Sequence, residues 1–106
     1  MADGVHAKLI LLEHGVLIRE YLMEKEIMTI GRISSCEIRL AYPPISRTHA
    51  RIERLDSDHY RLRDLNSKNG TLVNSTRVQE HRLRHGDRIL LGKYTVIFWC
   101  PRESKP

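Results

Sequence analysis

The chain has 106 residues, which is enough for one domain with a single hydrophobic core. Its 41% hydrophobic and 29% charged residues are ordinary for a globular domain and exclude an intrinsically disordered chain. The net charge of +5 favours an anionic partner, although lysine and arginine are dispersed among acidic residues without a compact basic block.

The first predicted elements are short. An apolar run at 8–12 predicts a strand that ends at the turn residues 13–15. The segment 16–28 is ambiguous, because its apolar residues fit an amphipathic helix about as well as two strands joined near Glu24 and Lys25. Periodicity alone leaves both alternatives open.

The middle of the chain shows alternation of period two. Ala50 and Ile52 are expected on one face of a strand, and Tyr60 and Leu62 on one face of the next. Breaks fall at paired prolines, at Asp and Ser residues, and at Asn-Gly and Gly-Asp pairs. The pattern predicts short strands separated by turns.

The last elements are two runs of strand-forming residues, 88–91 and 94–99, separated by a tight-turn signal at Gly92-Lys93. The aromatic residues Tyr94, Phe98 and Trp99 are expected in the core. Several short strands with frequent turns predict an all-β sandwich or barrel.

Polar residues gather where three predicted strands end. Gly31-Arg32 follows an apolar run, and its glycine allows a sharp turn. The guanidinium of Arg32 has five donors, stays charged and can bind two oxygens of a phosphate. Taken alone, the pair is better explained as a surface arginine behind a turn glycine.

Ser46 and His49 form the second group. Prolines 43 and 44 stiffen the approach to Ser46, whose hydroxyl can donate to a phosphate oxygen. The alternative for Ser46 is a turn serine that caps its own backbone. We interpret His49 as structural, because no second metal ligand lies at metal-binding spacing.

The third group is Lys68-Asn69-Gly70. An Asn-Gly pair between two strand patterns is a strong hairpin signal. The Asn69 amide can also donate to and accept from the backbone of an extended peptide, and Lys68 adds positive charge toward an anion. Together, the three groups suit capture of a phosphate and its attached peptide.

Several functional classes find little support in the sequence. No Ser/His/Asp arrangement, glycine-rich phosphate loop or metal set is evident, so we expect neither an enzyme nor a cofactor or metal. Cys36 and Cys100 are expected to be buried or half-buried thiols rather than a disulfide. No apolar run reaches membrane-spanning length and the start lacks a signal-peptide pattern, so we expect a cytoplasmic protein without a membrane partner.

In this order and spacing, the three groups resemble the forkhead-associated (FHA) domain. The resemblance covers roughly residues 9–99 and includes further segments at 29–32, 37–40, 45–50, 64–74 and 83–92. It implies an eleven-stranded β-sandwich of two twisted sheets, of the SMAD/FHA type, with the binding loops at one end. It also resolves 16–28 as two strands. We therefore expect a single FHA domain over 1–106, with a folded core of about 7–100 and a flexible tail at 101–106.

The resemblance also implies binding of a phosphothreonine-containing segment of a partner protein in Ser/Thr-kinase signalling. The residues expected to bind this phosphopeptide are Arg32, Ser46, Arg47, Lys68 and Asn69. Lys68 stands where many members have Ser or Thr and would supply charge instead. The residues expected to support the site are Gly31, His49, Gly70 and Asn74.

Two other functions remain as alternatives. The first is a phosphate-independent protein-interaction or self-association domain on the same fold. The second is a basic β-barrel that binds nucleic acid, which requires exposed aromatic residues on a strand face. Because the aromatic residues are expected in the core, we expect no specific nucleic acid. We also expect no small-molecule substrate. We expect a monomer.

Overall fold

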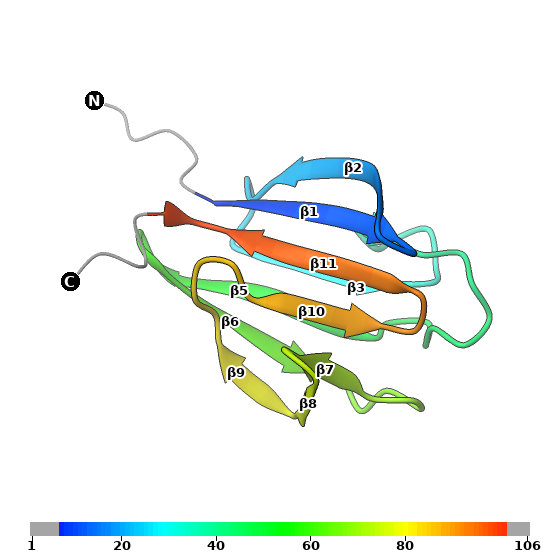
Figure 1. Ribbon diagram of the computed structural model, residues 1–106. Coiled ribbons are helices and arrows are strands. Elements are labelled where there is room, and N and C mark those ends of the chain that lie inside the picture. The colour runs from blue at the N-terminus through cyan, green and yellow to red at the C-terminus, as the bar shows by residue number, and fades with distance from the viewer. Residues whose placement is uncertain (1–6, 102–106) are drawn as a thin grey trace.

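A computed structural model describes residues 7–101 of the protein, and this part of the chain forms eleven β-strands (Figure 1). The strands are β1 (Lys8–Glu13), β2 (Val16–Leu22), β3 (Ile27–Gly31), β4 (Ile38–Arg39), β5 (Ala50–Asp56), β6 (His59–Asp64), β7 (Thr71–Val73), β8 (Thr76–Val78), β9 (Glu80–Arg82), β10 (Arg88–Leu91) and β11 (Tyr94–Trp99). The prediction of an eleven-stranded fold is confirmed.

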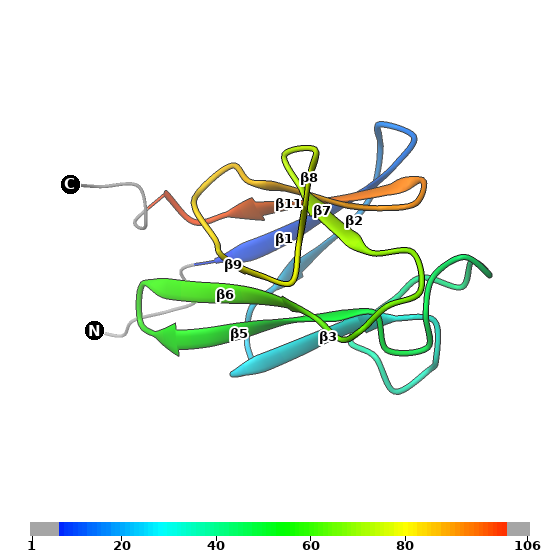
Figure 2. The same cartoon turned by 90° about the horizontal axis from the view of Figure 1, so that it is seen from below.

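The strands form two sheets that pack face to face, as Figure 2 shows from below. The six-stranded sheet has the order β2-β1-β11-β10-β7-β8, and the five-stranded sheet the order β4-β3-β5-β6-β9. The pairing of β3 with β4 is parallel, whereas β3 with β5 and β5 with β6 are antiparallel. The predicted β-sandwich is therefore present.

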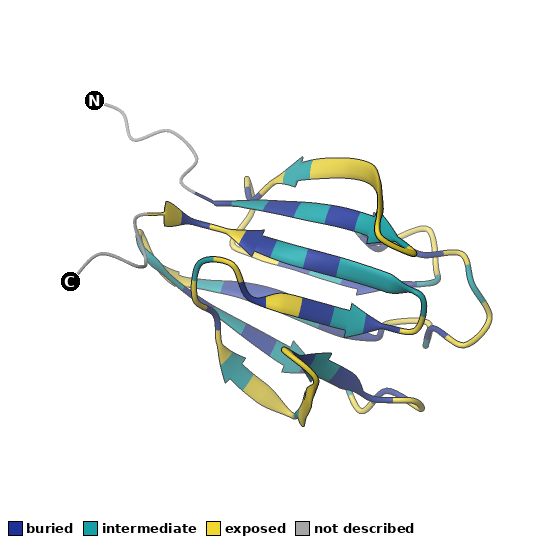
Figure 3. Ribbon diagram, in the orientation of Figure 1, coloured by how far each residue is buried: buried dark blue, intermediate teal, exposed yellow. Residues whose placement is uncertain are grey.

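The core lies between the sheets and follows the predicted alternation (Figure 3). In β6 and β11, Tyr60 and Phe98 point inward, with their ring centroids 5.2 Å apart. Ala50, Ile52 and Leu62 are also buried, as predicted. Cys36 and Cys100 are both buried, which agrees with the sequence interpretation.

The ambiguous segment 16–28 forms two strands rather than a helix, as the family resemblance implied. β2 pairs with β1, with a register shift between Leu11 and Leu12, and β3 begins at Ile27 in the other sheet. Met23 is buried between them. The apolar residues of β2 stay exposed at a sheet edge, which explains why they show no clear strand alternation.

The hairpin predicted at Asn69-Gly70 is wrong. β6 and β7 lie in different sheets, so the loop that contains this pair crosses from one sheet to the other. Gly70 still has the positive φ of 84° that a turn glycine supplies. The hairpin turn lies instead at Asn74-Ser75, between β7 and β8, where both residues have positive φ.

The core position predicted for Trp99 is also wrong. Trp99 is 42% exposed, because successive residues of a strand point to opposite faces and Phe98 takes the inward face. Tyr94 is half-buried and packs against the edge of the core. Of the predicted tail at 101–106, only Pro101 lies within the described residues.

Candidate functional site

Three loops meet at one end of the sandwich, on the right in Figure 1. They are the loop after β3, the loop between β4 and β5, and the loop between β6 and β7. The Arg32 amide donates to the Arg47 carbonyl (2.9 Å). The Lys68 amide donates to Ser46 Oγ (2.9 Å), and Asn69 Nδ2 donates to the Pro44 carbonyl (2.8 Å). The three groups predicted from the sequence are thus hydrogen-bonded into one surface.

Arg32 is half-buried and held in place through its Nε atom, which donates to the Ile45 carbonyl (3.1 Å). Its own carbonyl accepts from Arg39 Nε (3.1 Å). Within residues 7–101 its two terminal nitrogens make no hydrogen bond. Because the side chain is already oriented, less conformational entropy is lost when these nitrogens bind an anion.

The side chain of Ser46 reaches across to the neighbouring loop. Because Ser46 Oγ accepts from the Lys68 amide, the hydroxyl hydrogen remains available as a donor. The alternative of Ser46 capping its own backbone is therefore not what the structure shows. Its amide donates to His49 Nδ1 (3.1 Å), which fixes the loop that carries it.

His49 is buried, with 1% of its surface exposed, and does not reach the solvent-facing side of the site. Its Nδ1 accepts from Ser46, so its Nε2 must carry the proton and donates to the Gly70 carbonyl (2.8 Å). The neutral ring thereby joins the Ser46 loop to the Gly70 loop. Both ring nitrogens are occupied, which supports a structural role.

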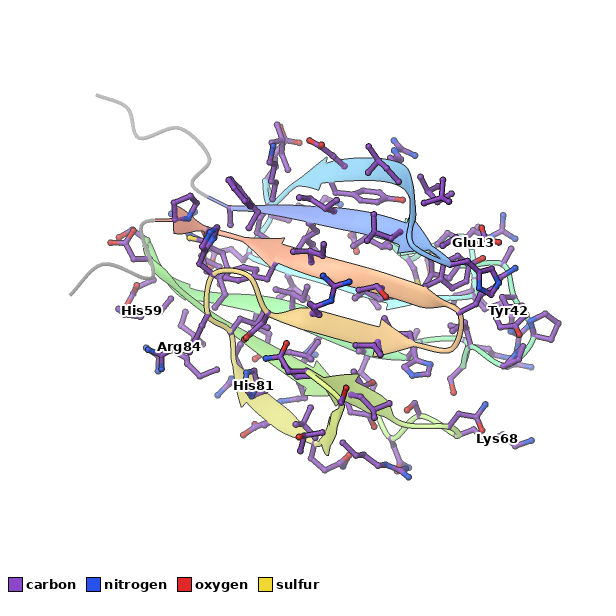
Figure 4. The ribbon with its side chains drawn as sticks, viewed as in Figure 1. Glu13, Tyr42, His59, Lys68, His81 and Arg84 are labelled. Atoms are coloured by element: carbon purple, nitrogen blue, oxygen red, sulfur yellow. The ribbon has the colours of Figure 1, made fainter. Side chains whose placement is uncertain are left out.

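Arg47, Lys68 and Asn69 are exposed at the rim, and Figure 4 shows Lys68 projecting at this end. Asn69 uses one amide hydrogen for Pro44, which leaves its second hydrogen and its carbonyl oxygen for a ligand. The Arg47 carbonyl accepts from the Arg32 amide, so its backbone is structural while its side chain faces solvent.

The positive charge of the site is not neutralised by the protein. Arg32, Arg39, Arg47, Lys68 and Arg77 make no ion pair with a carboxylate within residues 7–101, whereas the basic residues elsewhere often do. Cations without an ion pair on neighbouring loops, beside a hydroxyl with a free donor hydrogen, create a positive potential that can attract an anion. This uncompensated charge is the main electrostatic feature of the site.

A hydrogen-bond network around the Asp64 carboxylate shapes the loop between β6 and β7. The sequence analysis did not predict this network. Asp64 Oδ1 accepts from Ser67 Oγ (2.6 Å) and from Thr71 Oγ1 (2.7 Å), and Oδ2 accepts from the Ser67 amide (3.0 Å). Ser67 Oγ in turn accepts from the Gly70 amide (3.0 Å). The spacing of Asp64 and Ser67 is that of a side-chain-to-backbone turn, which is the local signal that could have revealed it.

We expect substitution of Asp64 by asparagine to change the acid stability of the domain. Burial alone would raise the pKa of Asp64, but hydrogen bonds from Ser67 and Thr71 outweigh it and lower the pKa below its ordinary value. A carboxylate with a lowered pKa stabilises the fold above its unfolded-state pKa, and this stabilisation is lost as the pH falls through the folded-state pKa. Asp64→Asn should lower the unfolding free energy at pH 7 by about 1.5–3 kcal/mol.

Urea unfolding between neutral and acidic pH measures this effect. The acid-dependent loss of stability should be smaller in Asp64→Asn than in the unmodified chain, with Glu37 and Glu53, whose pKa values are also lowered, supplying the remainder. Glu24→Gln, at an exposed carboxylate, is the matched control. Identical pH profiles for Asp64→Asn and the unmodified chain would contradict the assigned role.

Two glycines set the backbone of the site. A Cβ atom on Gly31 would meet the Arg47 carbonyl oxygen and, at 2.8 Å, Cys36 Sγ. Gly70 has positive φ, and the Arg77 side chain covers it, with Nε 2.7 Å from the position of an added Cβ. The sequence analysis missed Arg77, because this arginine comes from β8 and reaches the site only through the packing of that strand.

Asn74 lies in the turn after β7 rather than among the three loops. Its Nδ2 donates to Asp87 Oδ1 (3.0 Å), and its Oδ1 accepts from the Arg88 amide (3.0 Å). These bonds fix the start of β10. Any support that Asn74 gives to the site is therefore indirect and passes through the pairing of β7 with β10.

No group of three or more His, Cys, Asp or Glu residues in the described part of the chain could hold a metal ion. Between residues 7 and 101, no helix has the length and apolar character needed to cross a membrane.

Comparisons with known proteins agree with the geometry. The family model of the FHA domain matches residues 28–92. FhaA of Mycobacterium tuberculosis, an FHA domain-containing protein, is 42% identical over 79 residues, which are 74% of this chain and 15% of FhaA. The DNA damage response protein kinase DUN1 of Saccharomyces cerevisiae is 35% identical over 80 residues, 68% of this chain and 16% of the kinase. The chain thus spans a small part of these curated relatives.

Solved structures show the same relationship. A structure from an analysis of phosphothreonine-dependent FHA domain interactions has a TM-score of 0.78 and 38% identity, and covers 88% of this chain and 94% of its own. The FhaA FHA domain, solved in complex with the intracellular domain of Rv3910, has a TM-score of 0.77 and 38% identity, with coverages of 87% and 98%.

Proposed function

This chain belongs to the FHA domain family, and from that premise we propose that it binds a phosphothreonine-containing segment of a partner protein. The observation that carries the proposal is that the hydrogen-bonded loops hold the Ser46 hydroxyl together with Arg32, Arg47 and Lys68, which make no ion pair within residues 7–101. A phosphothreonine carries close to two negative charges and three acceptor oxygens, which such a surface complements. The proposed function is that of a recognition module in Ser/Thr-kinase signalling, without turnover of a substrate.

The phosphate is bound by Arg32 and Ser46 in this proposal. Arg32 offers its two terminal nitrogens to two phosphate oxygens, and the Ser46 hydroxyl donates to the third. Arg47 and Lys68 add charge at the rim. Each hydrogen bond to a charged group contributes about 1.5–3 kcal/mol, so two or three of them favour the phosphorylated peptide by about two to four orders of magnitude.

The peptide backbone next to the phosphothreonine is held by Asn69. The remaining hydrogen and the carbonyl oxygen of its side chain can bond to the backbone of an extended segment. The bond to Pro44 holds the amide in place beforehand. Gly31, His49 and Gly70 keep the three loops together, and Asn74 contributes through β10.

Ser46→Ala is expected to weaken binding of a phosphothreonine peptide by about ten- to a hundredfold, because one charge-assisted hydrogen bond to the phosphate is lost. Fluorescence anisotropy with a labelled peptide measures the affinity, and thermal unfolding checks that the variant folds. Thr76→Ala, at an exposed hydroxyl on β8, is the matched control. Unchanged affinity in Ser46→Ala would remove Ser46 from the site.

The same assay tests the whole proposal through the chemistry of the peptide. The phosphothreonine peptide should bind with a Kd of about 1 μM, and the unphosphorylated peptide should not bind measurably. A phosphoserine peptide lacks one methyl group and should bind about fourfold more weakly if that methyl is buried. Equal binding of phosphorylated and unphosphorylated peptides would overturn the proposal.

We also propose that the module acts in the cytoplasm, where ATP-dependent kinases phosphorylate such segments. A single FHA domain over 1–106 with a folded core of about 7–100 remains our proposal for the domain organisation. The residue preferred after the phosphothreonine follows from a screen of an oriented phosphothreonine peptide library.

A further inference from the structure

The outer face of the six-stranded sheet carries more apolar than polar residues, whereas the solvent side of a sandwich normally carries polar residues. Figure 1 looks onto this face. In β1 and β11, the pairs Leu9–Phe98 and Leu11–Val96 point into the core, so the pair Ile10–Ile97 between them points outward. The apolar residues that the register places on this face are Ile10, Leu12, Leu17, Leu22, Leu72, Leu90, Ile97 and Trp99.

These residues are neighbours on adjacent strands, interrupted by Thr95 between Leu12 and Leu90, and they are exposed or half-buried. They are not part of the buried core, and Leu17, Leu22 and Trp99 are 55%, 52% and 42% exposed. A contiguous apolar patch over several neighbouring strands marks an interaction surface, unlike single exposed apolar residues. We refer to it below as the outer face.

The register also places the charged residues Lys8, Glu20, Arg77 and Arg88 on the outer face, and two of them stand at opposite ends of one row. One row across the strands β2, β1, β11 and β10 consists of Glu20, Ile10, Ile97 and Arg88. A carboxylate thus stands at one end of the row and a guanidinium at the other, with two isoleucines between them. Arg88 makes no ion pair within residues 7–101, and Glu20 pairs only with Lys8 (3.2 Å).

In place of the monomer expected from the sequence, we propose that the outer face binds a second copy of this chain, related by a two-fold axis that runs between β1 and β11 parallel to the strands. This rotation places Glu20 opposite Arg88 of the second copy and Ile10 opposite Ile97 of the second copy. Each contact occurs twice, as an isologous interface requires. The rotation brings the carboxylate end of the row opposite the guanidinium end of the same row in the second copy. This complementarity of charge favours a second copy as the partner.

The same two-fold rotation also matches residues in the neighbouring rows across these strands. Leu17 at the β2 edge comes to lie opposite Leu90 of the second copy. Lys8, whose Nζ lies 5.8 Å from the Trp99 ring of its own chain, faces Trp99 of the second copy, where a cation–π contact can form. Packing of two sheets at about 10 Å, with nearly aligned strands, is the ordinary geometry of such a contact.

The dimer leaves both loop sites accessible, because the sites lie at strand ends and the contact lies on the sheet face. A two-fold axis parallel to the strands preserves strand direction, so both sites face the same way. This consequence rests on the proposed phosphothreonine binding: a partner with two phosphothreonine segments would gain avidity from the dimer.

Sedimentation velocity over a wide range of protein concentrations tests the proposal without any peptide. The unmodified chain should approach twice its mass of 12.4 kDa as the concentration rises. Trp99 is the only tryptophan, so its fluorescence should shift to shorter wavelength with the same concentration dependence. Arg32→Ala should leave both readouts unchanged, which separates self-association from phosphopeptide binding.

Charge reversal provides the decisive variants. In Glu20→Arg or Arg88→Glu alone, residues 20 and 88 carry the same charge, and they face each other at two places in the dimer. Each single variant should therefore raise the Kd of dimerisation about tenfold or more. The double variant Glu20→Arg/Arg88→Glu restores opposite charges across the axis and should recover dimerisation. Arg82→Glu, the same charge change on β9 of the other sheet, is the matched control and should dimerise normally.

Two outcomes would overturn the proposal. A chain that stays monomeric at every concentration would leave the outer face to a different protein partner. A dimer that the single reversals do not weaken, or that the double variant does not recover, would use another surface of the molecule.

Discussion

Arg32→Ala is expected to weaken binding of a phosphothreonine peptide by about a hundredfold or more, while the domain stays folded. Two charge-assisted hydrogen bonds to the phosphate are lost, each contributing about 1.5–3 kcal/mol. The structure adds a reason for a large effect: Arg32 Nε is already bonded to the Ile45 carbonyl, so the side chain is oriented before the ligand arrives. Fluorescence anisotropy with phosphorylated and unphosphorylated peptides measures the loss.

Two further variants sharpen this test. Arg32→Lys keeps the charge but loses the planar fork and the Nε donor, so it should recover only part of the affinity. Arg84→Ala removes an exposed arginine at the opposite end of the sandwich and should bind normally (Figure 4). If Arg32→Ala and Arg84→Ala bind alike, the phosphate is not bound by Arg32.

Gly31→Ala is expected to cause the largest loss of stability among single methyl additions to this chain. The new Cβ would meet the Arg47 carbonyl oxygen and Cys36 Sγ. That carbonyl accepts the Arg32 amide hydrogen, so it cannot move without breaking a bond between two loops of the site. Overpacking against backbone costs about 3 kcal/mol, a large part of the stability of a small domain.

Urea unfolding compares Gly31→Ala with a matched control. Gly15 has a positive φ of 80° but no atom near its added Cβ, so Gly15→Ala should cost only the backbone strain of about 1–2 kcal/mol. At temperatures where Gly31→Ala remains folded, its phosphopeptide affinity should also fall, because Arg47 and Arg32 are displaced. A Gly31→Ala variant as stable as Gly15→Ala would show that the site has room for a side chain.

Much of the fold could be predicted from alternation alone. The inward faces of β5 and β6 follow from Ala50, Ile52, Tyr60 and Leu62, since a strand can bury only every second residue. The exposed position of Trp99 follows from the same alternation, because Trp99 is adjacent to the inward-facing Phe98, although its aromatic character favours the core. The segment 16–28 could not be assigned from its pattern, because an edge strand exposed on both sides loses the alternation.

The chemical groups of the site are evident from the amino-acid order: a guanidinium, a hydroxyl and an amide at strand ends, with glycines where the backbone must turn. How these groups meet depends on the packing of the two sheets. Ser46 bonds to Lys68, and Pro44 to Asn69, across 22 and 25 residues of sequence. The loop at Asn69-Gly70 crosses between sheets instead of closing a hairpin, and Arg77 comes from β8. Dihedral preferences and alternation act over neighbouring residues, whereas sheet pairing and the balance of charge at the site depend on residues that packing brings together.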